Sequence, residues 1–152
     1  LVRQWRVPPT PPGWVVNEEG NYLLEAIVYV KQEKSFQKAD QDMVIKAYEK
    51  SDPDVGPTLT QFIDQTIRHY RSRNGGGTYS DATTIPSGAR GSLRVYSFKP
   101  GKPKDEPPSY ESWVFFEESQ CFIDIHVSAP SQAEHDAIFP VFKGIVSSFR
   151  KK

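Results

Sequence analysis

The sequence predicts an α+β fold in which a mainly antiparallel β-sheet of five to seven strands is sandwiched by two amphipathic helices. Two observations carry this prediction. Apolar runs separated by short turns recur along the chain, as they do in sheets built from hairpins. Two other segments, at about 58–73 and 131–149, place apolar residues at helical spacing and begin with capping signals.

The first strands are predicted near the start of the chain. Apolar runs at residues 14–17 and 22–31 flank the polar segment 18–21, which indicates a hairpin with its turn at Gly20-Asn21. The second run is apolar on both faces, which is typical of a strand covered on both sides. A third strand is expected at residues 42–50, after a polar connection.

The segment 58–73 has the complete pattern of an amphipathic helix. Thr58 and Gln61 have the spacing of a capping box, and Asn74-Gly75 provides a left-handed stop. The apolar residues fall on one stripe: Leu59, Phe62, Ile63, Ile67 and Tyr70.

Four further strands are predicted after this helix. Residues 78–85 are polar, which favours an edge position, and residues 89–98 alternate in character. Apolar runs at 110–118 and 121–128 are joined by a tight Ser119-Gln120 turn and form a hairpin. The proline-rich connection 99–109 is expected to be exposed and mobile.

The last helix is predicted at residues 131–149. Ser131 and Glu134 form a second capping box. Pro140 lies inside the pattern and should kink the helix, because proline lacks the backbone donor and clashes with the preceding turn. The apolar phase continues across the proline, so one core-facing stripe is expected: Ile138, Phe142, Ile145, Val146 and Phe149.

The chain of 152 residues fits one domain. Residues 1–13 hold four prolines and are expected to form an arm or linker, and residues 14–152 a single domain. The arm is of a kind common in exported proteins tethered to a membrane at the N-terminus. An exported, periplasmic or cell-surface location is therefore expected, with a cytoplasmic location as the alternative.

Composition argues against several function classes. Lys and Arg total 19 and Asp and Glu total 19, so the chain lacks the excess positive charge of a nucleic-acid binder. No apolar run approaches the length of a transmembrane helix. The three histidines are scattered without a metal-ligand pattern, and we find no catalytic motif and no cofactor motif. The single cysteine, Cys121, is expected to be a small buried side chain.

Several short motifs together resemble the PsbP-like superfamily. They are the helix TLTQFIDQTIRHY, the strand IPSGARGSLRVYSF, the hairpin YESWVFFEESQCFIDIHVSAP and the final helix ending IVSSF. This superfamily includes the extrinsic PsbP subunit of photosystem II, a Ran-binding nuclear import factor and many bacterial exported proteins of unknown role. The resemblance covers about residues 14–150. It implies an α/β/α sandwich and, for most members, no enzymatic activity.

One candidate ligand site lies on the strands of the second half. Asp124 and His126 are two residues apart on one strand and share a face, with Cys121 on the opposite face. Aromatic residues at like-facing positions could line a cleft beside them: Tyr96, Phe98, Trp113, Phe115 and Phe122. The alternative interpretation is core packing beneath a helix for the aromatics and a partly exposed polar pair for the other two.

A second candidate site is the basic end of the first long helix. Arg68, His69, Arg71 and Arg73 could bind an acidic partner, or they could simply complement the helix dipole. The leading functional expectation is a non-enzymatic binding or accessory module, exported or of lipoprotein type. The alternatives are a small-ligand carrier or enzyme using the aromatic face with Asp124 and His126, and an intracellular protein-interaction domain using residues 68–73.

Overall fold

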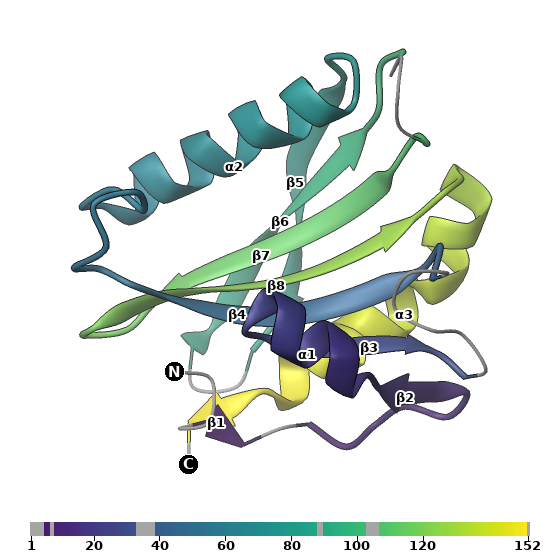
Figure 1. The fold of residues 1–152 in the computed structure, drawn as a ribbon, viewed down its shortest axis with the longest axis horizontal. Helices are drawn as coiled ribbons and strands as arrows, with labels where there is room; N and C mark the ends of the chain where they lie inside the picture. Colours follow the sequence, from purple (N-terminus) through teal and green to yellow (C-terminus); the bar gives the residue numbers. More distant parts are fainter. Residues whose placement is uncertain (1–4, 7, 33–38, 88–89, 103–106, 152) are drawn as a thin grey trace.

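The computed structural model describes residues 1–152 except 1–4, 7, 33–38, 88–89, 103–106 and 152. Its centre is a seven-stranded sheet in the order β2-β3-β4-β8-β7-β6-β5, in which every neighbouring pair is antiparallel (Figure 1). The strands are β2 (Trp14–Val16), β3 (Ile27–Lys31), β4 (Asp42–Glu49), β5 (Thr78–Pro86), β6 (Ser92–Lys99), β7 (Tyr110–Glu117) and β8 (Cys121–Ala129).

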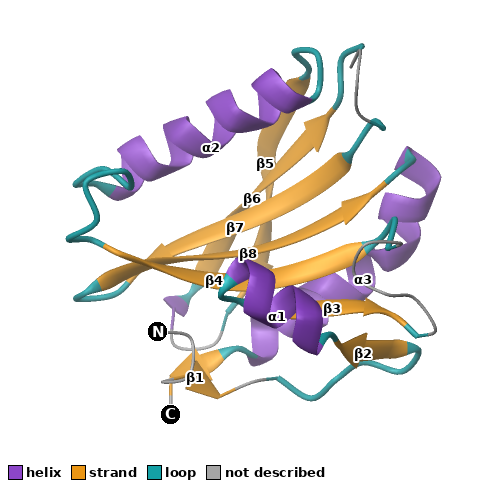
Figure 2. Ribbon diagram, viewed as in Figure 1, coloured by secondary structure: helices purple, strands orange, loops and turns teal. Residues whose placement is uncertain are grey.

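Helices cover both faces of this sheet. The helix α2 (Leu59–Arg73) lies across one face and α3 (Gln132–Ser148) packs on the other (Figures 1 and 2). A short helix, α1 (Glu18–Leu24), packs beside β3 on the same face as α2. The predicted α+β sandwich and its two long helices are confirmed. Thr58 caps the start of α2, and Ser131 caps the start of α3.

The helix α1 corrects the predicted hairpin. β2 and β3 do pair as expected, with Trp14 opposite Lys31, but a helix rather than a turn at Gly20-Asn21 connects them. The helix forms because the Asn17 side chain accepts a hydrogen bond from the Gly20 amide at 2.7 Å. Residues 22–24 therefore belong to this helix and not to the strand, which begins at Ile27.

The larger core lies between the sheet and α3. The predicted stripe of α3 is buried there along its whole length, on both sides of Pro140. The helix runs through this proline without ending. The expectation of one continuous core across the proline is confirmed.

The core beneath α2 is mainly aromatic. Phe62 of α2 packs on the rings of Phe115 and Phe122, with centroids 5.8 and 5.5 Å apart. Tyr70, one helical turn before the end of α2, packs on Phe98 at 4.6 Å. These contacts hold α2 against one half of the sheet and leave the other half of that face to α1.

The end of α2 is attached to the connection between β6 and β7. Asn74 is buried, and its side chain accepts from the Ser109 amide and donates to the Tyr70 carbonyl. Its carbonyl accepts from the Gly101 amide at 2.9 Å. Both described ends of the 99–109 connection are thus held in place. The predicted mobility of that connection concerns residues 103–106 as well, which lie outside the described residues.

The N-terminal arm joins the C-terminus. β1 (Trp5–Arg6) pairs antiparallel with β9 (Arg150–Lys151) in a separate two-stranded sheet. Trp14, at the end of the proline-rich segment, is buried in the core on the α3 side.

Candidate functional site

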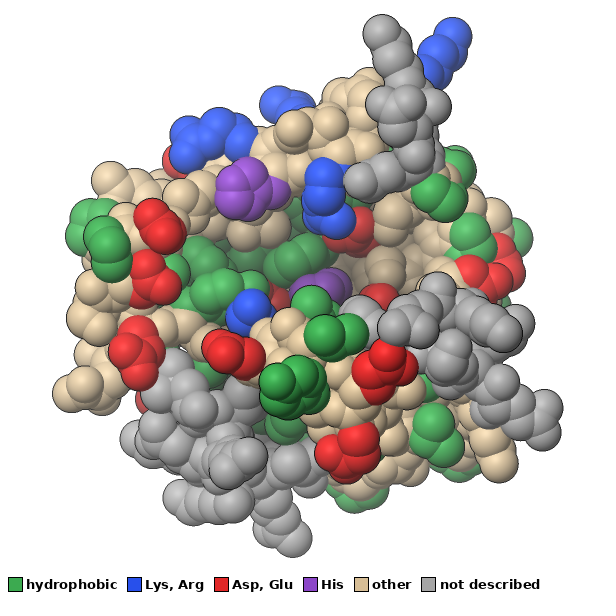
Figure 3. All heavy atoms as spheres, viewed as in Figure 1, with side chains coloured by type: hydrophobic (Ala, Val, Ile, Leu, Met, Phe, Trp, Pro, Cys, Tyr) green, Lys and Arg blue, Asp and Glu red, His purple; other side chains and the backbone are tan. Residues whose placement is uncertain are grey.

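A hollow opens between α1 and α2, on the sheet face that they share (Figure 3). Its floor contains hydrophobic side chains and a histidine, and charged side chains of both signs surround it. Strand register explains which side chains meet there. Trp113, His126 and Val44 lie side by side on β7, β8 and β4, and the next row on the same face is Phe115, Asp124 and Lys46.

The central pair is His126 with Asp124. The imidazole Nδ1 lies 2.9 Å from Asp124 Oδ1, so a carboxylate fixes the orientation of the ring. Asp124 is completely buried, whereas the side chain of His126 is 18% exposed. His126 Nε2 forms no hydrogen bond with a described residue and is not sealed from solvent. Asp124 Oδ2 is buried and has no hydrogen-bond partner among the described residues.

Trp113 supports the histidine from the neighbouring strand. Its indole stacks on the His126 imidazole with centroids 3.8 Å apart and 15° between the planes. The indole Nε1 donates to Glu111 Oε1 at 2.9 Å, and Glu111 is itself buried. The ring of His126 is therefore held from one side by a carboxylate and from one face by an indole.

Neighbouring carboxylates favour the charged form of this histidine. Burial is the largest single influence on the pKa of His126 and lowers it. The hydrogen bond to Asp124 and the negative charges of Asp124, Asp42 and Glu111 together outweigh burial, so the pKa lies above the ordinary value of 6.5. Burial, followed by the charge of Asp124, raises the pKa of Tyr48 on β4.

Two further cations lie near this pair. Lys46 is on the floor, and its Nζ lies 5.0 Å from the centre of the Tyr48 ring. Arg73, at the end of α2, has Nη2 at 3.9 Å from Glu111 Oε1, and about half of its side chain is exposed. The hollow therefore combines an aromatic floor with three basic groups from β4, β8 and α2.

The seven predicted ligand-site residues do share one sheet face, as the register shows. These residues differ, however, in how deeply they are buried. Phe98 and Phe122 are fully buried beneath α2, and Phe115 contacts Phe62 there. These three and the buried Trp113 are core residues of the aromatic cluster. His126 reaches the hollow, with Trp113 stacked beside it. A ligand-binding role for this set stays a prediction.

The four residues of the predicted basic set do not form one site. Arg68, His69, Arg71 and Arg73 are all exposed on α2, but their surroundings differ. Arg71 lies over the Tyr79 ring of β5 at 5.9 Å, whereas Arg73 lies beside Glu111 on β7. Arg68 lines a separate shallow pocket.

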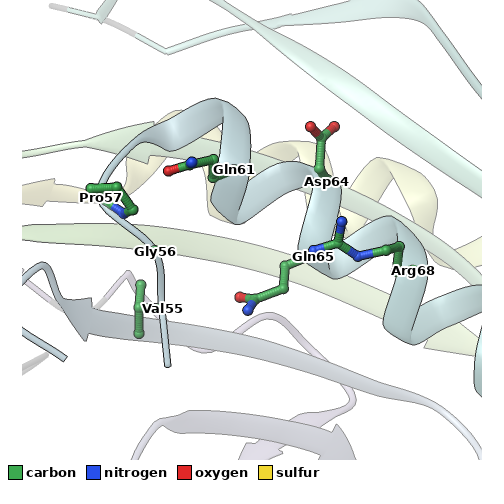
Figure 4. Close-up of a pocket in the computed structure, with 7 residues that line it drawn as sticks. All are labelled: Val55, Gly56, Pro57, Gln61, Asp64, Gln65 and Arg68. Carbon is green, nitrogen blue, oxygen red and sulfur yellow. The ribbon is translucent and has the colours of Figure 1, made fainter. Parts of the chain in front are cut away.

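That pocket lies at the start of α2 (Figure 4) and has a volume of about 280 Å³. It is lined by Val55, Gly56, Pro57, Gln61, Asp64, Gln65 and Arg68. Gln65 donates from its side chain to the Asp54 carbonyl at 2.9 Å, which connects the helix to the loop before it. The pocket is small, polar and open, and none of the predicted ligand-site residues lines it.

The sequence did not predict a set of hydrogen-bonded polar side chains on the α3 side of the sheet. Ser112 Oγ lies 2.7 Å from His135 Nε2 and 2.9 Å from Ser97 Oγ, and His135 Nδ1 lies 3.1 Å from Asp136 Oδ1. Because Ser112 is completely buried, we interpret these hydrogen bonds as a connection between α3 and the sheet and not as a nucleophilic site. The sequence signal for these hydrogen bonds was Ser112, a polar residue on the apolar face of residues 110–117.

The described residues contain neither a metal-binding cluster of side chains nor a membrane-spanning helix. The part of the chain that the structure describes contains no group of three His, Cys, Asp or Glu side chains arranged to hold a metal ion. Within the same residues, no helix has the length and apolar character needed to cross a membrane.

Comparison with known proteins finds similarity in structure alone. No protein-family model matches the sequence, and no curated protein matches it. The solution structure of cyanobacterial PsbP from Synechocystis is 15% identical, with a TM-score of 0.56 over 98% of this chain and 87% of that one. The Ran-binding protein Mog1p of Saccharomyces cerevisiae is 14% identical, with a TM-score of 0.55 over 93% of this chain and 87% of that one. The chain therefore has the fold of the PsbP-like superfamily.

Proposed function

We propose that the chain is a non-enzymatic binding or accessory module whose recognition site is the hollow between α1 and α2, centred on His126. One observation carries the proposal: a completely buried Asp124 orients an imidazole that reaches the hollow. Burying a carboxylate costs free energy. Charged groups kept in such positions are found more often at functional sites than elsewhere.

The geometry favours binding over catalysis. Nucleophilic catalysis requires a hydroxyl or thiol within hydrogen-bond reach of the base. Among the described residues, none lies within that reach of His126 Nε2. Cys121, the only cysteine, is buried on the α3 side of the sheet. An enzyme or carrier that uses Asp124 and His126 is thus the less favoured interpretation of the same hollow.

A second candidate is a protein-interaction domain that acts through Arg68, His69, Arg71 and Arg73. Their common exposure on α2 favours it, as does the name of one structural neighbour, which describes a Ran-binding protein. This candidate would place recognition on the outer surface of α2 instead of in the hollow. The two surfaces can be tested separately, because Arg68 and His126 lie on different elements.

We further propose an exported location, either periplasmic or cell-surface, for this domain. The proline-rich composition of residues 1–13 supports it, since such a segment can act as an extended spacer between a tether and a domain. Fractionation of cells expressing the full precursor tests the location. Recovery of the protein only from the cytoplasm would contradict it.

The function is tested by native mass spectrometry and affinity capture of the wild-type protein and two single variants. His126→Ala alters the hollow, and Arg68→Ala is the matched control on the outer side of α2. We expect a retained small molecule or captured protein to be lost with His126→Ala and kept with Arg68→Ala. Loss with Arg68→Ala alone would support the α2 surface and overturn the proposal. Both variants should unfold at the wild-type urea concentration for the comparison to stand.

A further inference from the structure

Beyond binding in general, we infer that the hollow takes a carboxylate joined to an apolar or aromatic group, with His126, Lys46 and Arg73 as its cationic contacts. This inference rests on the proposed function, because it names the ligand chemistry of the same hollow.

Three carboxylates close to His126 are already engaged in hydrogen bonds. Asp124 binds His126 through Oδ1, while its Oδ2, unpartnered among the described residues, is buried, and Glu111 accepts from the indole of Trp113. Asp42 accepts from the Ser128 hydroxyl at 2.6 Å. Asp124 and Glu111 are also buried, so neither is well placed to meet a cationic ligand arriving from solvent.

The basic groups of the hollow, in contrast, retain donors. His126 Nε2 has no hydrogen bond with a described residue. Lys46 Nζ contacts the Tyr48 ring but forms no ion pair with a described residue. The contact of Arg73 with Glu111 is 3.9 Å long, which leaves most of its five donors for another acceptor. Around His126, the accessible hydrogen-bonding capacity is therefore mainly that of cationic donors, which suits an anion.

The proton on His126 decides whether the ring can contact an anion. With Nδ1 donating to Asp124, the neutral ring presents Nε2 as an acceptor, and the protonated ring presents Nε2–H as a donor. The carboxylates whose charges act on the ring are Asp124 on β8, Asp42 on β4 and Glu111 on β7. The basic groups on the same face are Lys46 on β4, opposite Asp124, and Arg73 on α2, beside Glu111. Because only the protonated ring donates from Nε2, anion binding should take up a proton and weaken as pH rises.

The floor of the hollow suits an apolar group attached to the carboxylate. This floor is largely hydrophobic, as Figure 3 shows. The Tyr48 ring is only partly buried and lies beside Lys46. An apolar or aromatic group next to the carboxylate would cover the floor and exclude water from the ion pairs, which strengthens them. A bare inorganic anion would lack this contribution.

The probe is phenylacetate, with phenylacetamide as its uncharged counterpart. Isothermal titration calorimetry is performed at about pH 5.5 and about pH 8.5, on either side of the ordinary histidine range. We expect phenylacetate to bind at the lower pH, to weaken about tenfold at the higher pH, and phenylacetamide to bind at least about tenfold more weakly. A peptide ending in phenylalanine, with a free or an amidated C-terminus, distinguishes a peptide end from a free acid as the source of the carboxylate.

The variants are His126→Gln, Lys46→Gln and Arg73→Gln, with Arg68→Gln as the control that removes the same charge from the outer side of α2. Each of the first three should weaken binding at low pH, and His126→Gln should also remove its pH dependence. If one of them fails to fold, the other two still test the site. Arg68→Gln should bind as the wild type does.

The possible outcomes separate the two proposals. Equal binding of phenylacetate and phenylacetamide, or no binding of either phenylacetate or the free peptide end, overturns the carboxylate inference. The proposed function would survive that result if a native ligand were still lost with His126→Ala. Binding of phenylacetate that is weakened by Arg68→Gln and by none of the hollow variants would overturn both proposals.

Discussion

Asp124 and His126 form a 2.9 Å hydrogen bond between a completely buried carboxylate and an imidazole that reaches the hollow. The pair therefore connects a group inside the protein with a side chain that is accessible from the hollow. Trp113 stacks on the same imidazole, so the ring has little freedom to turn away. The ionisation of His126 is therefore coupled to groups that ligands cannot contact directly.

The first prediction concerns the charge of this pair. Asp124→Asn should lower the pKa of His126 below its wild-type value, because it removes both the hydrogen bond to a carboxylate and the nearest negative charge. NMR titration of the imidazole Cε1–H signal measures this pKa. An unchanged titration midpoint would show that Asp42 and Glu111 alone sustain the charge.

The same shift predicts how stability depends on pH. The pKa of His126 in the folded protein is raised, so its contribution to the free energy of unfolding is fully present below about 6.5, the pKa of an unfolded histidine. The contribution should be lost as pH rises through the folded pKa. Urea unfolding across this range should show the loss in the wild type and a smaller loss in Asp124→Asn.

The second prediction concerns Tyr29, whose buried hydroxyl has no hydrogen-bond partner among the described residues. Tyr29→Phe should raise the free energy of unfolding by about 1 kcal/mol, because an unpartnered polar group is removed from the core. Burial raises the pKa of Tyr29 to about 12. The wild type should therefore lose stability as pH rises above about 10, and Tyr29→Phe should lose less. A destabilised variant would mean that the hydroxyl makes a favourable contact.

The layered architecture was predictable because its signals are local. The alternation of residues 121–128 placed Asp124 and His126 on one face and Cys121 on the other, and the structure agrees. The caps Thr58 and Ser131 were predicted correctly for the same reason, since a cap depends only on the next three residues.

The features that were missed depend on contacts distant in sequence. Phe98, Phe122 and Trp113 alternate alike and all three are buried, but only the position of α2 decides that Phe98 and Phe122 pack beneath it whereas Trp113 stacks on His126. The pairing of Glu111 with the Trp113 indole likewise requires side-chain geometry that no spacing specifies. The helix α1 did carry a local signal, the Asn17 cap, but its seven residues are too few for an apolar stripe.

The third prediction tests the attachment of α2 to the connection after β6. A Cβ on Gly101 would lie 2.1 Å from the carbonyl oxygen of Gly75, which is backbone and cannot move aside cheaply. Gly101→Ala should lower the free energy of unfolding by about 1–3 kcal/mol, as overpacking does. Gly144→Ala is the matched control, because Gly144 is exposed within α3 and a Cβ there would meet nothing within 4 Å. It should raise stability by about 0.5–1 kcal/mol. Equal effects of the two substitutions in urea unfolding would contradict the close approach.

The fourth prediction tests the core across Pro140. Phe142 is completely buried between α3 and the sheet, so Phe142→Ala should lower the free energy of unfolding by about 3–5 kcal/mol. Pro140 is exposed and lies inside the helix, where its ring removes a backbone donor. Pro140→Ala should therefore leave stability unchanged or raise it, because alanine restores the donor while the buried stripe stays in place. Urea unfolding of both variants measures the two effects. A loss of stability in Pro140→Ala comparable to that in Phe142→Ala would show that the proline itself sets the packing of α3. An unmoved midpoint in Phe142→Ala would show that α3 does not contribute to the core.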